Sequence, residues 1–447
     1  MKWINRLIDS VASRGRELLH AEDPSRFDMA YSLQEDCTAL LNQRGDAVAL
    51  AIAQQILDRY VRLSTEEKLS FFQYLARDLS PDYQALGKHA QAMDEQPDAR
   101  TYRRLLASLR QGRWTLFELL NIPGVGTQAL VRMREDLLDH LPEHPELKAV
   151  DLDLQTILEA WFNRGFLEFR EINWHTPADV LEKLIRYEAV HEIQNWQDLK
   201  RRLASDRACF AFFHPALPDE PLIFVQVGYT DAVSAAIDPF LDQDQPEVDA
   251  DQANTAIFYS ISNCQKGLRG ISFGNFLIKQ VVQHIQQNHP HITQFSTLSP
   301  IPGLSRALNS EKLDETRLEQ LAGNQLGELK ERYQVSSLRD LLQHKADKLS
   351  VDHAPTVLFI EKLGLAYLTE VKRESEPYDP VARFHLSNGA SIFRINAFAN
   401  CRPYGLKSSY GLMVNYLYDL SRVEQNHEQF KRNGTIDVHR AMRKKLG

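Results

Sequence analysis

The sequence predicts an α+β protein in which an all-helical region, residues 1–158, precedes an α/β region, residues 159–447. In the first region, apolar residues recur at helical spacing. From about residue 205 onwards, short apolar or alternating runs indicate strands instead. A chain of 447 residues is too long for one ordinary core, so we expect at least two domains.

The first region contains signals for several separate helices. One apolar stripe has i, i+4 spacing and consists of Val48, Ile52, Ile56 and Tyr60. Ser64 and Glu67 form a capping box that opens the next helix. Breaks are expected at residues 42–45, 94–98 and 142–145. Because no catalytic constellation is visible here, we expect this domain to serve oligomerisation.

Composition excludes some functions. Hydrophobic residues make up 43% and charged residues 25%, as in ordinary globular proteins. The net charge of −8 argues against a general nucleic-acid binder, which needs a basic surface. Residues 119–126 resemble the hairpin of helix-hairpin-helix DNA-binding modules, which leaves a nucleic-acid-binding scaffold as an alternative. A turn between two bundle helices is the favoured interpretation of this segment.

The cellular location is predicted from targeting and membrane-spanning signals that the sequence does not show. No apolar run approaches the roughly 20 residues that span a bilayer. Residues 1–19 are amphipathic and faintly resemble a transit peptide, but their two acidic residues favour a first structural helix. The four cysteines lie far apart and indicate reduced thiols, although a cross-link between subunits stays an alternative. We therefore expect a cytoplasmic protein without a membrane partner.

The second region contains a strand–loop–helix–strand unit. The expected strands are 209–213, 222–227, 256–262, 295–298, 391–397 and 412–418. The helix between 262 and 295 has an apolar stripe that consists of Leu277, Ile278, Val281, Val282 and Ile285. This order predicts a βαβ unit. Residues 304 to about 376 are helical and charged, and we expect them to form an insertion.

A glycine-rich turn, residues 265–271, leaves the third of these strands and opens the helix. Glycines let the backbone approach a ligand closely, and free amides of a first helical turn favour an anion. A pyrophosphate fits this arrangement, and Lys266 and Arg269 add cations. Such turns are common, so the pattern alone is a weak signal.

Three segments taken together resemble the malonyl-CoA decarboxylase family. They are the glycine-rich segment 260–271, the run Phe295-Ser296-Thr297-Leu298-Ser299-Pro300-Ile301-Pro302-Gly303, and Phe384-His385-Leu386-Ser387-Asn388-Gly389-Ala390. Further matching segments are 187–191, 214–215, 220–222, 379–385 and 411–416. The resemblance covers residues 159–447. Position 410 departs from it, because this chain has a tyrosine where the animal enzymes have a cysteine.

The resemblance implies a fold, a reaction and a set of site residues. The second domain would be similar to GNAT acyltransferases, and the reaction would turn malonyl-CoA into acetyl-CoA and CO2. Ser296 would contact the malonyl group, His385 would donate a proton, and Tyr418 would line the same pocket. The coenzyme A moiety would be bound by Lys266, Gly267, Leu268, Arg269, Gly270, Ile271 and Ser272. A homo-oligomer, dimer or tetramer, is expected.

The chemistry of this reaction is consistent with these residue types. Loss of CO2 from a malonyl thioester leaves an enolate, which needs a fixed donor near its oxygen and an acid near its alpha carbon. Histidine has a suitable pKa. The thioester is itself the electron sink, so we predict no metal and no cofactor beyond the coenzyme A of the substrate. A GNAT-type acyltransferase, which would need an acceptor amine and a base, is the alternative enzyme.

Each residue also has a structural interpretation. A histidine in a strand, as we place His385, is more often structural, and Ser296 alternates with Phe295 as a cross-strand serine would. His289-Pro290-His291 resembles a pair of metal ligands, but adjacent histidines would point apart on a strand, and we interpret the run as a loop. Asn388 and Asn396 are alternatives as oxyanion donors, although a turn and a ladder position explain them equally well.

Overall fold

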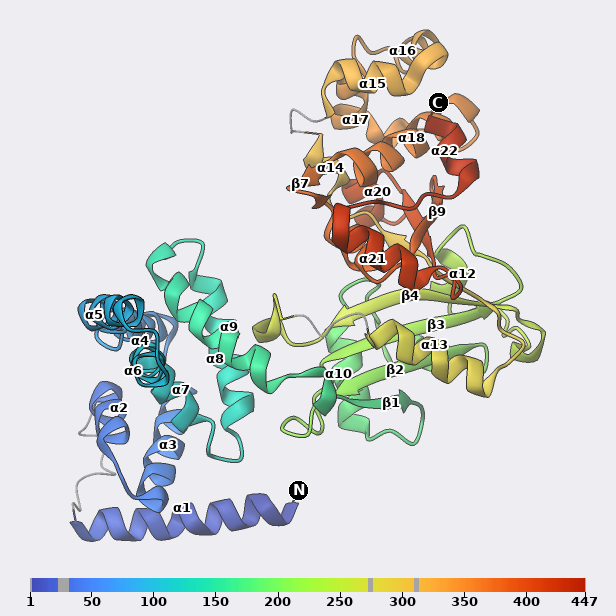
Figure 1. The fold of residues 1–447 in the computed structure, drawn as a ribbon. Coiled ribbons are helices and arrows are strands. Elements are labelled where there is room, and N and C mark those ends of the chain that lie inside the picture. Colours follow the sequence, from blue (N-terminus) through green and yellow to red (C-terminus); the bar gives the residue numbers. More distant parts are fainter. Residues whose placement is uncertain (1, 23–31, 272–275, 309–312, 447) are drawn as a thin grey trace. The chain divides into compact units, whose positions relative to one another are not determined.

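The computed structural model describes residues 2–22, 32–271, 276–308 and 313–446. It divides into two compact units. The helical unit consists of Met1–Glu168, Phe213–Glu220 and Gln265–Phe273. The sheet unit consists of Phe169–Phe212, Pro221–Cys264 and Gly274–Gly447. Figure 1 shows the elements of both units.

The helical unit confirms the predicted all-helical region. Its helices are α1 (Lys2–Glu22), α2 (Leu33–Asn42), α3 (Asp46–Tyr60), α4 (Thr65–Arg77), α5 (Tyr83–Glu95), α6 (Ala99–Leu109), α7 (Arg113–Leu120), α8 (Gly126–His140) and α9 (Lys148–Trp161). The predicted stripe on α3 is buried in the core. The capping box of Ser64 and Glu67 opens α4 as predicted. The 119–126 segment is a turn between α7 and α8, in which the Gly126 amide donates to the Pro123 carbonyl.

The sheet unit is built on a mixed sheet with the strand order β1-β2-β3-β4-β5-β10-β6, and β9 pairs with β10. The strands are β1 (Glu168–Ile172), β2 (Arg207–Phe213), β3 (Ile223–Thr230), β4 (Thr255–Asn263), β5 (Gln294–Thr297), β6 (Ser299–Pro300), β9 (Ser391–Asn396) and β10 (Met413–Leu417). All six predicted strands are present. The sequence did not predict β1, whose side chains are only partly buried, or β6, which has two residues.

The predicted βαβ unit is also present. Strands β4 and β5 pair in parallel from Thr255↔Gln294 to Phe258↔Thr297. Helix α13 (Phe276–Asn288) connects them, and its predicted apolar stripe is buried. The pairs β2–β3 and β3–β4 are antiparallel, as are the pairs of β10 with β5, β6 and β9. The parallel ladder ends at Phe258↔Thr297, and the chain continues through Leu298 into β6. Both β5 and β6 pair with β10 in one antiparallel register, through Leu417↔Ser296 and Val414↔Ser299.

The sheet unit also contains helices, and one group of them forms the predicted insertion. Helices α10 (Ala178–Tyr187) and α11 (Trp196–Arg202) lie between β1 and β2 in the sequence, and α12 (Asp238–Leu241) lies between β3 and β4. The insertion consists of α14 (Leu304–Ala307), α15 (Glu315–Ala322), α16 (Leu326–Tyr333), α17 (Leu338–His344) and α18 (Ala354–Glu370). The short hairpin of β7 (Lys372–Arg373) and β8 (Glu376–Pro377) closes it. The remaining helices are α19 (Pro380–Ser387), α20 (Pro403–Ser409), α21 (Val423–Asn433) and α22 (Arg440–Leu446).

Within the part of the chain that the structure describes, no helix has both the length and the apolar character to cross a membrane.

Candidate active site

His385 lies in the last turn of α19, not in a strand as the sequence suggested. The helix forms because Asp379 caps it: its carboxylate accepts hydrogen bonds from the Val381 and Ala382 amides at 2.9 and 3.0 Å. Pro380 occupies the first helical turn, where its missing amide is not needed. These local signals override the apolar character of the segment, and they turn the buried His385 ring towards β10.

Three residues hold the His385 ring. Its Nδ1 atom lies 2.8 Å from the Tyr418 hydroxyl, and its Nε2 atom lies 3.2 Å from the Ser299 hydroxyl. The ring stacks on Tyr416, with the centroids 4.7 Å apart. Tyr418 is itself fixed by its amide, which donates to the Phe295 carbonyl at 2.9 Å. The structure therefore brings two of the predicted residues, His385 and Tyr418, into direct contact.

Burial sets the charge state of this group. It lowers the pKa of His385 from 6.5 to about 3, so the imidazole is neutral at neutral pH. Burial also raises the pKa values of Tyr416 and Tyr418 well above 10. All three side chains are thus uncharged hydrogen-bonding groups in a dry environment.

Two serines of the same segment have different partners in the structure. Ser296 is buried in β5, opposite Leu417, and its hydroxyl donates to the Tyr416 carbonyl at 3.1 Å. Ser299 is the serine in contact with His385, and its hydroxyl donates to Thr297 Oγ1 at 2.8 Å. Sequence reasoning missed Ser299, although it lies in the same segment as Ser296. Only the packing of this segment between β10 and α19 shows which hydroxyl meets the ring.

One buried polar atom of the site has no partner. The Tyr416 hydroxyl makes no hydrogen bond within the described residues. Each of the two asparagines considered as oxyanion donors already uses one of the two N–H groups of its amide. The Asn396 amide nitrogen donates to Asn415 Oδ1 at 2.8 Å, and the Asn388 amide nitrogen donates to the Phe384 carbonyl at 2.6 Å. Tyr416 is therefore the more available donor beside His385.

The glycine-rich turn belongs to the helical unit, where it packs on α8. A short 3-10 helix, Lys266–Leu268, follows β4. The Arg134 guanidinium donates to the carbonyls of Gly267 and Arg269 at 2.8 and 2.9 Å. A side chain at position 267 would place its Cβ 1.9 Å from the Val131 carbonyl oxygen, so packing on α8 already requires this glycine.

The other residues of the turn differ in their availability. Lys266 Nζ forms an ion pair with Asp139 at 2.7 Å. Leu268 and Ile271 are buried, and Gly270 has a φ of +86°, which favours glycine. The Arg269 side chain is exposed, and no ion pair is recorded for it in the described ranges. Ser272, the last predicted binding residue, lies outside the described residues.

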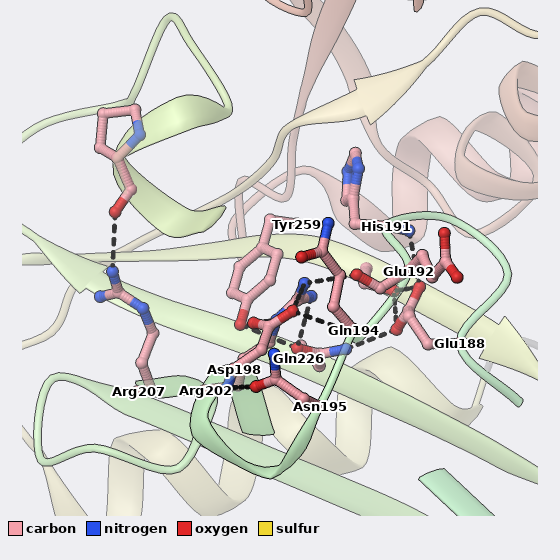
Figure 2. A network of polar contacts seen from close by, with 12 residues as sticks. Glu188, His191, Glu192, Gln194, Asn195, Asp198, Arg202, Arg207, Gln226 and Tyr259 are labelled. Atoms are coloured by element: carbon pink, nitrogen blue, oxygen red, sulfur yellow. Dashed lines mark hydrogen bonds and ion pairs between the residues drawn. The ribbon is translucent and has the colours of Figure 1, made fainter. Parts of the chain in front are cut away.

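A second buried polar cluster lies in the sheet unit (Figure 2). The Glu188 carboxylate accepts hydrogen bonds from Ser260, from Gln226 and from the His191 amide. The hydroxyl of Tyr259 donates to Gln226 Oε1 at 2.9 Å. This network fixes the segment after α10 against β3 and β4.

The His191 ring of this cluster is buried and lies beside a cavity. Burial lowers its pKa to about 3, and its ring forms a hydrogen bond with the Tyr259 backbone. Its Nε2 atom is buried without a partner in the described part of the chain. His191 lines a cavity of about 420 Å³ together with Asn400, Arg402 and Tyr404.

Known protein families match both halves of the chain. Residues 165–447 match the malonyl-CoA decarboxylase C-terminal domain, and residues 79–162 match the malonyl-CoA decarboxylase N-terminal domain.

Individual proteins are also similar. The mitochondrial malonyl-CoA decarboxylase of Anser anser anser is 36% identical over 380 residues, which cover 79% of this chain and 74% of the goose protein. The enzyme of the same name from Rattus norvegicus is 37% identical over 322 residues, covering 67% of this chain and 64% of the rat protein.

Two solved structures have the same fold. Malonyl-CoA decarboxylase from Rhodopseudomonas palustris has a TM-score of 0.83 and 42% identity, covering 92% of this chain and 98% of that one. The protein of the same name from Agrobacterium vitis has a TM-score of 0.81 and 39% identity, covering 93% and 99%.

Proposed function

Since this chain belongs to the malonyl-CoA decarboxylase family, we propose that it converts malonyl-CoA to acetyl-CoA and CO2, with His385 delivering the proton. The observation that carries the mechanism is the buried His385 ring, held between Tyr418 and Ser299. A ring fixed at both nitrogens is oriented before substrate arrives, which lowers the reorganisation that the reaction requires.

The hydrogen-bond network favours one tautomer. The Ser299 hydroxyl donates to Thr297 Oγ1, so its oxygen is free to accept from His385 Nε2–H. Tyr418 then donates to Nδ1. In this arrangement the transferable proton lies on Nε2, on the Ser299 side of the ring. A neutral imidazole is a weak acid, but the thioester enolate is a strong base, so transfer from Nε2 to the alpha carbon is feasible.

The enolate oxygen also needs a donor during loss of CO2. The Tyr416 hydroxyl is buried, uncharged and unpartnered among the described residues, and its ring stacks on His385. We assign it the role of donor to the thioester oxygen. A preorganised donor in a dry site stabilises developing negative charge strongly.

The remaining residues are given separate roles. Ser296 is proposed as the contact to the malonyl group, and Ser299 as the residue that positions His385. The turn Lys266–Ser272 is proposed to bind coenzyme A. Its exposed Arg269 supports this, because a cation is available there for a phosphate.

The assembly and the location are proposals as well. We propose a homo-oligomer, either dimer or tetramer, in the cytoplasm, with malonyl-CoA and acetyl-CoA as ligands and neither nucleic acid nor membrane as a partner. The acidic composition supports the absence of a nucleic-acid partner, which would need a basic surface. Light scattering on the purified protein measures the assembly directly, and a strictly monomeric protein contradicts it.

The experiment that tests the function supplies malonyl-CoA without any acceptor amine and measures both acetyl-CoA and CO2. Equal amounts of the two products are expected. The matched variants are His385→Asn and His344→Asn, the second being an exposed histidine on α17. His385→Asn should lower turnover by about 100-fold to 10,000-fold, the usual contribution of a general acid. If the wild type forms acyl product only when an amine is added, the chain is an acyltransferase instead.

A further inference from the structure

Two segments of the sheet unit meet beside the starts of β4 and β5. One is the short 3-10 helix Ala250–Gln252 before β4, and the other is the turn 289–291 after α13. Backbone hydrogen bonds hold them together: the Asn254 carbonyl accepts from the amides of Thr293 and Gln294 at 3.0 and 3.1 Å. The two segments therefore keep a defined separation.

This junction places three potential metal ligands together. Asp251, His289 and His291 each offer one ligand atom, and the three atoms lie within 4.8 Å of one another. Two ligands of one tetrahedral zinc ion lie about 3.3–3.4 Å apart, given bonds of about 2.0–2.1 Å. Rotation of the exposed Asp251 side chain can close that difference.

The orientation of His291 is typical of a metal ligand. Its Nε2 atom lies 2.9 Å from the Ala250 carbonyl oxygen. A backbone carbonyl can only accept, so Nε2 carries the proton and Nδ1 keeps its lone pair. Histidine ligands of metals usually donate their other ring N–H to a carbonyl or carboxylate in this way. His289 is steadied separately by the Tyr229 ring, 5.1 Å away between centroids.

The local charge also favours a cation. Asp249 caps the 3-10 helix through the Asp251 amide and adds a second carboxylate nearby. Neither 249–254 nor 288–294 contains a lysine or an arginine. Two imidazoles with one carboxylate form a donor set suited to zinc and related divalent transition ions.

We propose that Asp251, His289 and His291 bind one divalent transition metal ion, with Zn²⁺ as the expected occupant. The ion would link the segment before β4 to the turn before β5. It would raise the stability of the folded protein and would take no part in the chemistry at His385. In the sequence alone only the run His289-Pro290-His291 is visible, and we interpret that run as a loop. The fold supplies the third ligand from a segment distant in the chain.

The test uses untagged protein with Cys401→Ser, because Cys401 is an exposed thiol that could bind zinc itself. Isothermal titration with Zn²⁺ measures affinity, and Co²⁺ serves as a spectroscopic probe of the ligands. His289→Gln, His291→Gln and Asp251→Asn are the variants, and His175→Gln, an exposed histidine in another turn, is the control. Zn²⁺ should bind at one to one and raise Tm in the parent and the control.

Each histidine variant should weaken binding by more than about 100-fold, since loss of an outer-shell partner alone costs about 10–100-fold. Asp251→Asn should weaken Zn²⁺ binding too. Because Asp251 is exposed, this variant should fold, and it keeps the test valid if a histidine variant does not fold. Unchanged affinity in the three variants, or no Zn²⁺ binding to the parent, overturns the proposal. Neither outcome bears on the decarboxylation of malonyl-CoA, which is measured separately.

Discussion

The Nδ1 atom of His385 and the hydroxyl oxygen of Tyr418 lie 2.8 Å apart, and both side chains are buried. This contact connects the last turn of α19 to the residue after β10. In the proposed tautomer the Tyr418 hydroxyl donates to Nδ1, so removal of this hydroxyl should alter catalysis more than folding.

Tyr418→Phe tests this contact directly. The variant keeps the ring but removes the donor to Nδ1, so His385 loses its orientation. A hydrogen bond contributes about 0.5–1.5 kcal/mol net, which corresponds to a decrease in kcat of up to about tenfold. Steady-state kinetics and Tm should be measured on one preparation. A normal kcat with a lowered Tm would show that the contact is structural only.

The two serines can be separated by a double-mutant cycle. Ser299 is proposed to act through His385, so Ser299→Ala should lower kcat in the wild type and have little further effect on His385→Asn. Ser296 is proposed to contact the substrate independently. Ser296→Ala should therefore lower kcat/KM by a similar factor in both backgrounds. The reverse pattern would assign the substrate contact to Ser299.

Tyr416→Phe distinguishes an oxyanion donor from a core residue. The hydroxyl is buried without a partner among the described residues, so its removal should leave Tm unchanged or raise it. If it donates to the thioester oxygen, kcat should fall by about 100-fold or more, as for other oxyanion donors. Tyr410→Phe, at another buried tyrosine, is the control. A fully active Tyr416→Phe enzyme removes this residue from the mechanism.

Stability should fall as the pH is lowered. The pKa values of His385 and His191 are lowered by burial from 6.5 to about 3, so between these values the unfolded chain binds protons that the folded chain does not. The free energy of unfolding should then decrease by at most about 1.4 kcal/mol per pH unit for each histidine. Urea unfolding from neutral pH to about pH 5 measures the slope.

Histidine variants identify the source of this slope. His385→Asn and His191→Asn should each reduce it by up to one proton, whereas the exposed His344→Asn should not. An unchanged slope in the first two variants would mean that these rings are already protonated in the folded protein.

The glycine-rich turn should respond differently at two positions. Gly267→Ala should lower Tm, because the new Cβ would lie 1.9 Å from the Val131 carbonyl oxygen. Arg269→Ala should leave Tm unchanged and raise KM for malonyl-CoA about tenfold, the effect of losing one charge-assisted contact. Lys200→Ala, at an exposed lysine of α11, is the control. A normal KM in Arg269→Ala would exclude this side chain from coenzyme A binding.

Local sequence signals determined most of the secondary structure. The α3 stripe, the Ser64 capping box and the alternating runs of β2 to β5 depend on neighbours within a few residues, so they can be seen in one sequence. The interpretation of His385 as a strand residue is wrong, because Asp379 caps helix α19 and Pro380 occupies its first turn. A short segment with both apolar residues and a helix cap is ambiguous until its packing is known.

The sequence by itself also determined the candidate residues His385 and Tyr418, and through its motifs the family. Only the tertiary structure decided which groups meet. Ser299 rather than Ser296 reaches the imidazole because the two serines lie three residues apart along β10, and alternate residues of an extended segment face opposite sides. The low pKa of His385 likewise arises from burial by segments distant in sequence. Contacts and desolvation depend on the whole fold, so no local pattern of residues contains them.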